Sequence, residues 1–479
     1  MKDIEFIIEG MERIRPEMMK VRDAIFNYAE LPYKETKSAE ILCETLTKHG
    51  FDVKRGLAEI PTCFTGEYQY GEGGMTMGLL GEFDALDGLS QEAGCTVQNP
   101  VEENAPGHGC GHCCLGTGAL AAAILVKEYL ETHQIPGKVI YYGCPAEEGA
   151  GAKQFMARAG LFDVCDFIYT WHPSSKNEVD AMHSNAIMGA NFYFKGRTAH
   201  AGATPHLGRS ALDAAELMSV GCNYLREHMI PEARLHYAYI DAGGTAPNVV
   251  QDRAVVRYEV RAPYVRQTKE LYDRVVKVAQ GAAMMTETEV TPELAMAFTE
   301  YLPNFALARI ADQCMQEIGA PQWDEADYRL AKQFLESFPE ESKKAIRQKF
   351  MEDYPEDWEE KWEKPLDSEI HPFTPDKVYL SAGSTDVGDV GYAVPCLNLN
   401  VACACLGNIG HTWQMTAQAG SILGEKGTLA AGKMLALSCL RTMQEPQAVE
   451  EAKQEVLRRN GGRYTCPLPD TVKPPIDTY

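Results

Sequence analysis

The stretch PGHGCGHCCLGTG, at residues 106–118, holds side chains that could support two kinds of chemistry. Cys110 and Cys113 flank Gly-His in a CGHC pattern, which is typical of proteins that exchange disulfides through a low-pKa thiol at a helix N-terminus. Cys110 and His112 are two residues apart. An extended or turning backbone would therefore place both side chains on one side, where they could bind a metal ion. These two alternatives predict different residues elsewhere in the chain.

A disulfide-exchange site requires a buried strand directly before its first cysteine. Residues 96–109, with the sequence TVQNPVEENAPGHG, are instead polar and turn-forming, and no such strand can be read there. The chain contains 15 cysteines, an odd number without a regular framework. This pattern is typical of reduced thiols inside a cell, so we expect a cytoplasmic protein. A CGHC thiol-disulfide oxidoreductase is thus the weaker alternative.

A metal site predicts further ligands, and candidates stand where several apolar strands end. Glu82 and Asp84 end one such segment, Glu147 and Glu148 follow a second, and His172 follows a third. In open α/β sheets, ligands bind beyond the carboxyl ends of the strands. A metal hydrolase also needs one carboxylate left free as general base, and adjacent glutamates point apart and can divide these tasks. A thiolate beside imidazole and carboxylate groups suits zinc, with manganese or cobalt as alternatives.

The elements that would position these residues alternate between strand and helix, which favours an α/β fold with a mostly parallel sheet. At 479 residues the chain is longer than a single core usually allows, so two domains are expected. Between residues 187 and 301 the order changes to βαββαβ, which suits a small inserted α+β domain. We therefore predict a discontinuous catalytic domain, at residues 1–186 and 302–479, and an inserted domain at 187–301.

Composition excludes several classes of partner. The formal charge of −23 disfavours nucleic acids and anionic membrane surfaces. The first 20 residues mix charged and apolar side chains, so we expect neither a signal peptide nor an anchor there. No apolar run approaches the roughly 20 residues that span a bilayer. Residues 324–364 are dense in charged and aromatic side chains, and we expect solvated helices or a cover that faces a partner.

Five motifs, in this order, resemble those of the aminoacylase and carboxypeptidase-G-like metallopeptidases: HGCGH, CPAEEG, TWHP, FKGRTAHAG and HTWQMTAQ. PHLGRSALDA and GSTDVGDV add similarity to the amidohydrolase branch of that family, which includes p-aminobenzoyl-glutamate hydrolases. The resemblance covers almost the full chain. It implies a zinc-peptidase-like catalytic domain, and it implies that the inserted domain is a lid and dimerisation domain.

The resemblance also implies roles for individual residues. Glu147 would be the general base, and the divalent metal ligands would be Cys110, His112, Glu148, His172 and His411. His411 lies far from the other four in the sequence, and spacing alone would not select it.

In the lid, the resemblance implies that His200 reaches a neighbouring subunit's site and stabilises the oxyanion. Asn248 and Arg261 match positions that hold the substrate's carboxylate. A homodimer, or a heteromer with a homologous subunit, is therefore expected.

Two departures from the family pattern affect the expected number of ions. Glu82 stands where many relatives carry the histidine of a His-x-Asp pair, and Cys113 stands where acyl-amino-acid hydrolases have aspartate after the metal-binding histidine. One or two ions per subunit are therefore implied.

The function that the resemblance implies is hydrolysis of the amide bond of an N-acyl amino acid. The expected substrate is p-aminobenzoyl-glutamate, which would yield p-aminobenzoate and glutamate. The alternatives are a dipeptidase or another N-acyl-amino-acid hydrolase and, from a different class, a non-catalytic partner subunit.

Overall fold

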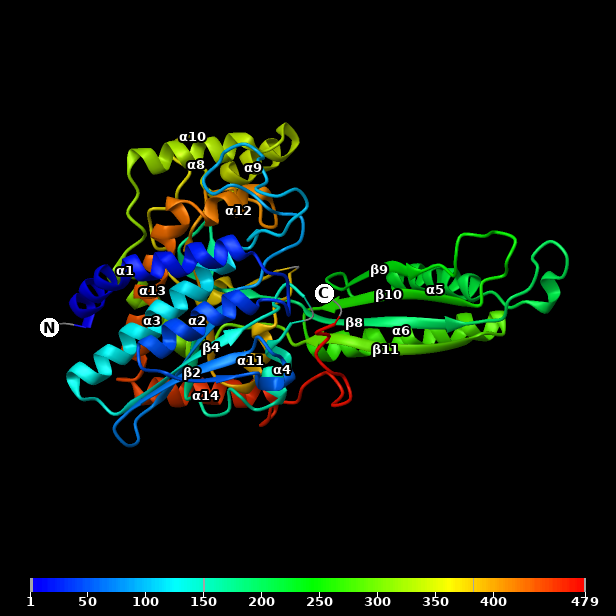
Figure 1. The fold of residues 1–479 in the computed structure, drawn as a ribbon, viewed down its shortest axis with the longest axis horizontal. Helices are drawn as coiled ribbons and strands as arrows, with labels where there is room; N and C mark the ends of the chain where they lie inside the picture. Colours follow the sequence, from blue (N-terminus) through cyan, green and yellow to red (C-terminus); the bar gives the residue numbers. More distant parts are fainter. Residues whose placement is uncertain (1–2, 150, 382, 478–479) are drawn as a thin grey trace.

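The computed structural model describes residues 3–149, 151–381 and 383–477, which form two bodies (Figure 1). The larger body contains both ends of the described chain. The smaller body extends from it as an elongated arm built from the middle of the sequence (green in Figure 1). Short 3-10 helices occur in both, at η1 (Leu57–Glu59), η2 (Pro205–Leu207), η3 (Arg226–His228) and η4 (Pro375–Lys377).

The larger body is built on a sheet with the strand order β1-β2-β4-β3-β5-β13-β6. Its four neighbouring central strands, β4, β3, β5 and β13, are parallel, while the pairs toward both edges are antiparallel. The predicted α/β fold is therefore confirmed, with the parallel part confined to the centre. The strands are β1 (Asp52–Arg55), β2 (Phe64–Tyr70), β3 (Thr76–Glu82), β4 (Gly137–Cys144), β5 (Phe167–Ser174), β6 (Glu178–Val179) and β13 (Cys396–Ala402). A separate pair is formed by β7 (Met182–His183) and β12 (Tyr379–Leu380).

Helices pack on both faces of this sheet. The main hydrophobic core includes α1 (Asp3–Tyr28), α2 (Thr36–Lys48), α3 (His112–His133), α7 (Phe305–Ile318) and α13 (Ile422–Thr442). A second core includes α4 (Lys153–Arg158), α11 (Val387–Ala393) and part of the C-terminal tail. The remaining helices of this region are α12 (Trp413–Ala419) and α14 (Pro446–Asn460).

Close packing of α3 against the sheet fixes the helix that begins at His112. A Cβ atom at Gly116 would lie 2.6 Å from the carbonyl oxygen of Glu82, and one at Gly118 would lie 2.8 Å from the Trp171 ring. Trp171 also donates a hydrogen bond to the Leu115 carbonyl at 2.9 Å. The small residues in LGTGA therefore set the helix directly over β3 and β5.

The length and composition of α3 correct one expectation. This helix has 22 residues and a window of mean hydropathy 1.4, which is apolar enough for a membrane span, although no such segment was predicted. Of that window, 89% is buried inside the protein. Its apolar character is thus accounted for by packing between the sheet, α1 and α13.

The arm has the predicted order of elements and a sheet of its own. The strands β8 (Ala186–Lys195), β9 (Arg234–Asp241), β10 (Arg253–Ala262) and β11 (Glu289–Phe298) form an antiparallel sheet in the order β11-β8-β10-β9. Helices α5 (Ala211–Leu225) and α6 (Val265–Thr286) cover one face of this sheet. Alternate residues of β10 are buried beneath the helices, so the others lie on the uncovered face. The predicted limits, 187 and 301, fall next to the ends of β8 and β11.

Residues 324–364 form three helices on the outside of the larger body: α8 (Glu325–Ser337), α9 (Glu340–Asp353) and α10 (Trp358–Glu363) (top of Figure 1). Their charged faces are exposed, but Phe334, Phe350 and Trp362 are buried in a small core with Leu406. Gly407 adopts φ +78°, and a Cβ atom there would lie 2.4 Å from Ile346. These helices therefore pack directly on the loop that leads to His411.

Candidate active site

A pocket of about 310 Å³ lies at the carboxyl ends of the central parallel strands. Glu82 ends β3, Glu147 and Glu148 follow β4, and His172 lies near the end of β5. These four side chains line the pocket together with Cys110 and His411, among others. The topology thus brings together residues from distant parts of the sequence at one edge of the sheet.

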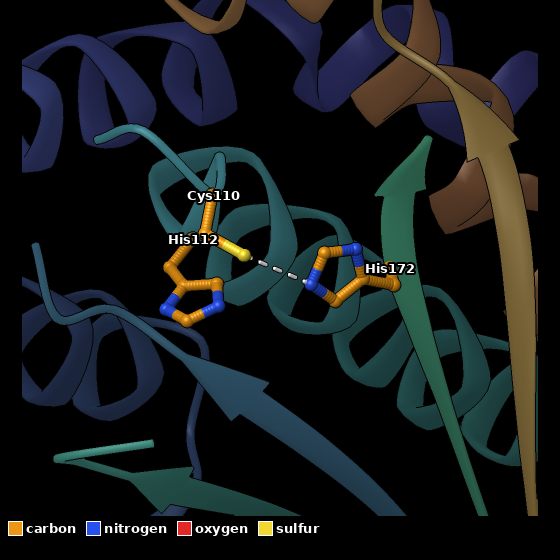
Figure 2. A group of neighbouring side chains, drawn as sticks. All are labelled: Cys110, His112 and His172. Carbon is orange, nitrogen blue, oxygen red and sulfur yellow. Dashed lines mark hydrogen bonds between the residues drawn. The ribbon is translucent and has the colours of Figure 1, made fainter. Parts of the chain in front are cut away.

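Cys110, His112 and His172 form the first group of possible metal ligands (Figure 2). Cys110 precedes α3, and His112 is the first residue of this helix. Both side chains lie close to His172 on the neighbouring strand β5. The Sγ atom of Cys110 lies 3.2 Å from Nε2 of His172. Nδ1 of His172 lies 2.8 Å from the Pro173 carbonyl, to which it donates, and this leaves the lone pair of Nε2 for a ligand.

Cys110, Glu148 and His411 form a second group, so the thiol belongs to both. The Oε1 atom of Glu148 lies 3.4 Å from Nε2 of His411. The backbone N–H of His411 donates to the carbonyl of Gly109 at 2.9 Å, which joins the His411 loop to the Cys110 loop. His411 has φ +56°, so the local conformation is imposed by its surroundings.

Glu82, His112 and Glu147 form a third group, next to a buried lysine. Lys153 is fully buried, and its Nζ atom lies 2.6 Å from Glu82 and 2.6 Å from Asp386. Burial raises the pKa of Glu147 well above its ordinary value, and the neighbouring carboxylates of Glu82 and Glu148 raise it further. A raised pKa of this kind suits a carboxyl group that accepts a proton and later returns it.

The donor atoms fit a divalent metal ion. Nε2 of His112 and Oε1 of Glu148 are buried and make no hydrogen bond, although Nε2 lies 3.2 Å from Glu82 and Oε1 lies 3.4 Å from His411. Potential ligand atoms gathered in this way without hydrogen bonds are expected where an ion binds. Burial raises the pKa of the Cys110 thiol, so its thiolate needs a positive partner. Nδ1 of His112 lies 2.8 Å from Asp84, an arrangement that orients a metal-binding imidazole. Sulfur, nitrogen and carboxylate oxygen together are typical of a zinc or related site.

Known proteins are similar to this chain in sequence and in fold. The family described as Peptidase family M20/M25/M40 matches residues 78–343, more than half of the chain. The chain belongs to this family. It is 39% identical to one subunit of the p-aminobenzoyl-glutamate hydrolase of Escherichia coli K12, over 98% of both chains. Another subunit of the same hydrolase is 24% identical over 67% of this chain and 83% of its own length.

A solved structure supports the fold of this M20 chain. A dinuclear metal-binding peptidase of family M20 from Bacillus subtilis matches with a TM-score of 0.57. The match has 13% identity and covers 91% of this chain and 99% of the solved one. Family membership makes the chain a metal-binding hydrolase of amide or peptide bonds, and it disfavours the disulfide-exchange alternative for CGHC.

The structure of this M20 chain does not bring the three predicted lid residues to the pocket. His200 and Asn248 lie together at the far end of the arm, where the N–H of Ala201 donates to the Asn248 carbonyl at 2.9 Å. Both side chains are exposed. Arg261 lies at the other end of β10, on the uncovered face of the sheet. The intervening strand is roughly 25 Å long, so His200 and Asn248 cannot act at the same site as Arg261 of the same chain.

Three residues that position the site were missed by the sequence analysis. Glu35 is fully buried and accepts a hydrogen bond from the N–H of Ala146, at 2.8 Å, just before Glu147. Lys153 and Asp386 form the buried ion pair described above. The sequence signal for Lys153 is a cation at the start of a short, largely apolar helix segment after the PAEEG turn.

Asp84 provides a testable prediction, because it accepts from His112 through one oxygen and from the N–H of Glu148 through the other. Replacing Asp84 by Asn is expected to weaken metal binding about 10-fold to 100-fold, since the amide cannot accept at both positions. Competition with a chromogenic chelator measures this affinity. Asp87 is exposed nearby, and Asp87→Asn serves as the matched control. Equal affinity in the two variants would contradict the orienting role of Asp84.

Proposed function

We propose that this chain hydrolyses p-aminobenzoyl-glutamate to p-aminobenzoate and glutamate. The observation that carries the proposal is the convergence of Cys110, Glu147, Glu148, His172 and His411 on one pocket of an M20 chain. Similarity along nearly the whole sequence to one subunit of a p-aminobenzoyl-glutamate hydrolase supports the choice of substrate.

We infer one or two divalent ions per subunit, of zinc or manganese, held by Cys110, His112, Glu148, His172 and His411. Cys110 belongs to two of the three-residue groups, so it would be available as a ligand in either of them. When bound, the metal would supply Lewis-acid stabilisation and lower the pKa of water. Proton transfer and the positioning of the ligands are carried out by side chains of the protein.

Glu147 lines the pocket and makes no ion pair with a lysine or arginine among the described residues. It would accept a proton from the attacking water and later deliver it to the leaving amine of glutamate. Lys153, which is also paired with Asp386, holds the neighbouring Glu82, so Glu147 remains the free carboxylate. Asp84 contacts both the His112 ring and the backbone of Glu148, so it fixes the distance between the two groups of ligands to which these residues belong.

The lid is proposed to complete the site of a second subunit, either another copy or a homologous chain. Nδ1 of His200 accepts hydrogen bonds from the N–H groups of Gly202 and Ala203 at 3.2 and 3.1 Å. The neutral ring then carries its proton on Nε2, where it can donate to an oxyanion. Arg261, at the opposite end of β10 from His200, would instead hold the glutamate carboxylate at the site of its own chain through its guanidinium fork.

The surface of the lid supports pairing with a second subunit. β9 is an edge strand with β10 as its sheet neighbour, and exposed edges of this kind commonly pair with another chain. Large apolar side chains are exposed on α5 and β9, namely Leu217, Val220, Tyr224, Tyr237, Tyr239 and Ile240. Such a patch is typical of a protein–protein interface.

The experiment that tests the substrate is release of p-aminobenzoate from p-aminobenzoyl-glutamate by the purified chain. The protein is loaded with zinc or manganese, and the control is the same preparation stripped by a chelator. Metal-dependent release is the expected result. A loaded protein that binds metal but releases nothing, either alone or with a homologous subunit, would overturn the proposed substrate.

A mixing experiment tests whether His200 acts across the interface. The variants His200→Asn and Glu147→Gln are each expected to be nearly inactive alone. If His200 serves the partner's site, exchange of protomers should restore roughly a quarter of wild-type activity in an equal mixture, because half of the dimers are mixed and each has one intact site. Size-exclusion chromatography establishes that exchange has occurred. Exchange without recovery would place His200 outside the partner's site.

A further inference from the structure

The pocket extends beyond the candidate metal ligands, along the face of the sheet. In the paired strands β5 and β13, Asn400 lies opposite His172 and Asn398 lies opposite Thr170. Both asparagines line the pocket, whereas the alternate residues of β13 are buried apolar side chains. Asparagine is disfavoured in a central strand, so this LNLN pattern needs a reason other than strand stability.

Asp180 lies at the end of this polar row. It lines the pocket, yet only 3% of its surface is exposed. Its Oδ2 accepts from Nδ2 of Asn398 at 2.9 Å, and its Oδ1 accepts from the N–H of Met182 at 3.0 Å. Each carboxylate oxygen can accept a second hydrogen bond, so the group retains capacity for a donor from a ligand.

The other walls of this part of the pocket are apolar or aromatic. Met182, Tyr301 and Tyr379 line it, and the hydroxyl of Tyr301 is fixed by accepting the N–H of Asn398 at 3.0 Å. Along the strand, His172 and Thr170 are separated by roughly 6.5 Å. If the amide carbonyl of a benzoyl substrate is held at the metal ligands, the aromatic ring therefore extends along the strand. Its para substituent would then lie near Asn398 and Asp180.

The charge of the pocket selects which end of the substrate enters. Among the described residues, no lysine or arginine lines it, whereas Glu147, Glu148 and Asp180 do. A carboxylate would be repelled at the Asp180 end, beyond the candidate metal ligands, and the cation suited to it, Arg261, stands on the lid. The pocket therefore accepts the acyl part of the substrate and leaves glutamate to the lid side.

We propose that Asp180, held by Asn398, recognises a hydrogen-bond donor at the para position of an aromatic acyl group and so selects aminobenzoyl over benzoyl substrates. The inference rests on the proposed function, because it assigns the acyl side of the same site. The para-amino group donates to the carboxylate of Asp180, and the ring packs against Tyr301 and Met182. A benzoyl group would leave this carboxylate without its additional donor.

The test compares kcat/KM for p-aminobenzoyl-glutamate, benzoyl-glutamate and p-nitrobenzoyl-glutamate with the metal-loaded protein. Wild type is expected to prefer the amino compound over the benzoyl compound by roughly 10-fold to 1,000-fold, because an unmatched buried acceptor is costly. The nitro compound, which only accepts, should be the poorest. Asp180→Asn should reduce the preference to within a few-fold while benzoyl-glutamate is still hydrolysed.

The preference is expressed as the ratio of kcat/KM for two substrates, because a loss of metal or of folded protein lowers both values equally and cancels in the ratio. Asn398→Asp provides a second variant, which removes the amide that holds Asp180, and it should also narrow the preference. Two results would overturn the role of Asp180 and leave the proposed function standing. One is that wild type hydrolyses p-aminobenzoyl-glutamate and benzoyl-glutamate equally well, and the other is that both variants retain the wild-type preference for the amino compound. Failure of wild type to hydrolyse any of the three would overturn both.

Discussion

Replacing Glu147 by Gln is expected to lower kcat by a factor of about 10² to 10⁴, the usual contribution of a positioned general base. Gln has the size of Glu but cannot accept a proton from water. Glu147 lines the pocket beside Glu148 and Glu82. Of these carboxylates, Glu82 is engaged by Lys153 and Glu148 lies next to His411, which leaves Glu147 for proton transfer.

The control for this variant separates catalysis from metal binding. Glu147→Gln should retain the metal content and thermal unfolding midpoint of the wild type, because the change conserves shape and removes a carboxyl whose pKa is already raised by burial. Glu148→Gln, one residue away, should instead lose metal. Steady-state kinetics and metal analysis of both proteins give the comparison. Wild-type turnover in Glu147→Gln would exclude it as the base.

Replacing Lys153 by Met is expected to lower the free energy of unfolding by about 3–5 kcal/mol, as is typical when one partner of a buried ion pair is removed. Lys153 has no exposed surface and holds Glu82 and Asp386 at 2.6 Å each. Without it, two buried carboxylates face each other and Glu147 with no positive charge between them. Equilibrium unfolding in urea measures the change.

Two further variants show whether the loss comes from unpaired charge. Adding Asp386→Asn and Glu82→Gln to Lys153→Met should recover part of the stability, because neutral amides are cheaper to bury than unpaired carboxylates. Lys269 pairs with Asp273 at the surface, and Lys269→Met should cost at most about 1 kcal/mol. Equal losses in Lys269→Met and Lys153→Met would show that the buried pairing adds nothing.

Much of the catalytic domain could be predicted because its signals are local. Apolar strands followed by acids or histidine placed Glu82, Glu147, Glu148 and His172 at one edge of a parallel sheet, and the structure has them there. The two-residue spacing of Cys110 and His112 predicted the first pair of metal ligands. The βαββαβ order of the inserted domain followed from a change in periodicity, and strands and helices occur in that order.

The rest depends on contacts between residues far apart in the sequence. His411 could be selected only through family resemblance, and its position results from a loop that packs on Ile346 and bonds to Gly109. Lys153 resembles any helix lysine until Glu82 and Asp386 are seen on both sides of it. The separation of His200 from Arg261 depends on the direction of the lid strands, which composition does not give.

The pairing of β5 with β13 has a consequence for the order of events during synthesis. These neighbouring strands are roughly 230 residues apart in the chain, and the whole lid is made between them. On the ribosome the lid therefore emerges while the catalytic sheet still lacks a central strand. Because His411 emerges later still, the full set of predicted ligands becomes available only when most of the polypeptide has been made. We therefore expect metal to be acquired late in synthesis or after it.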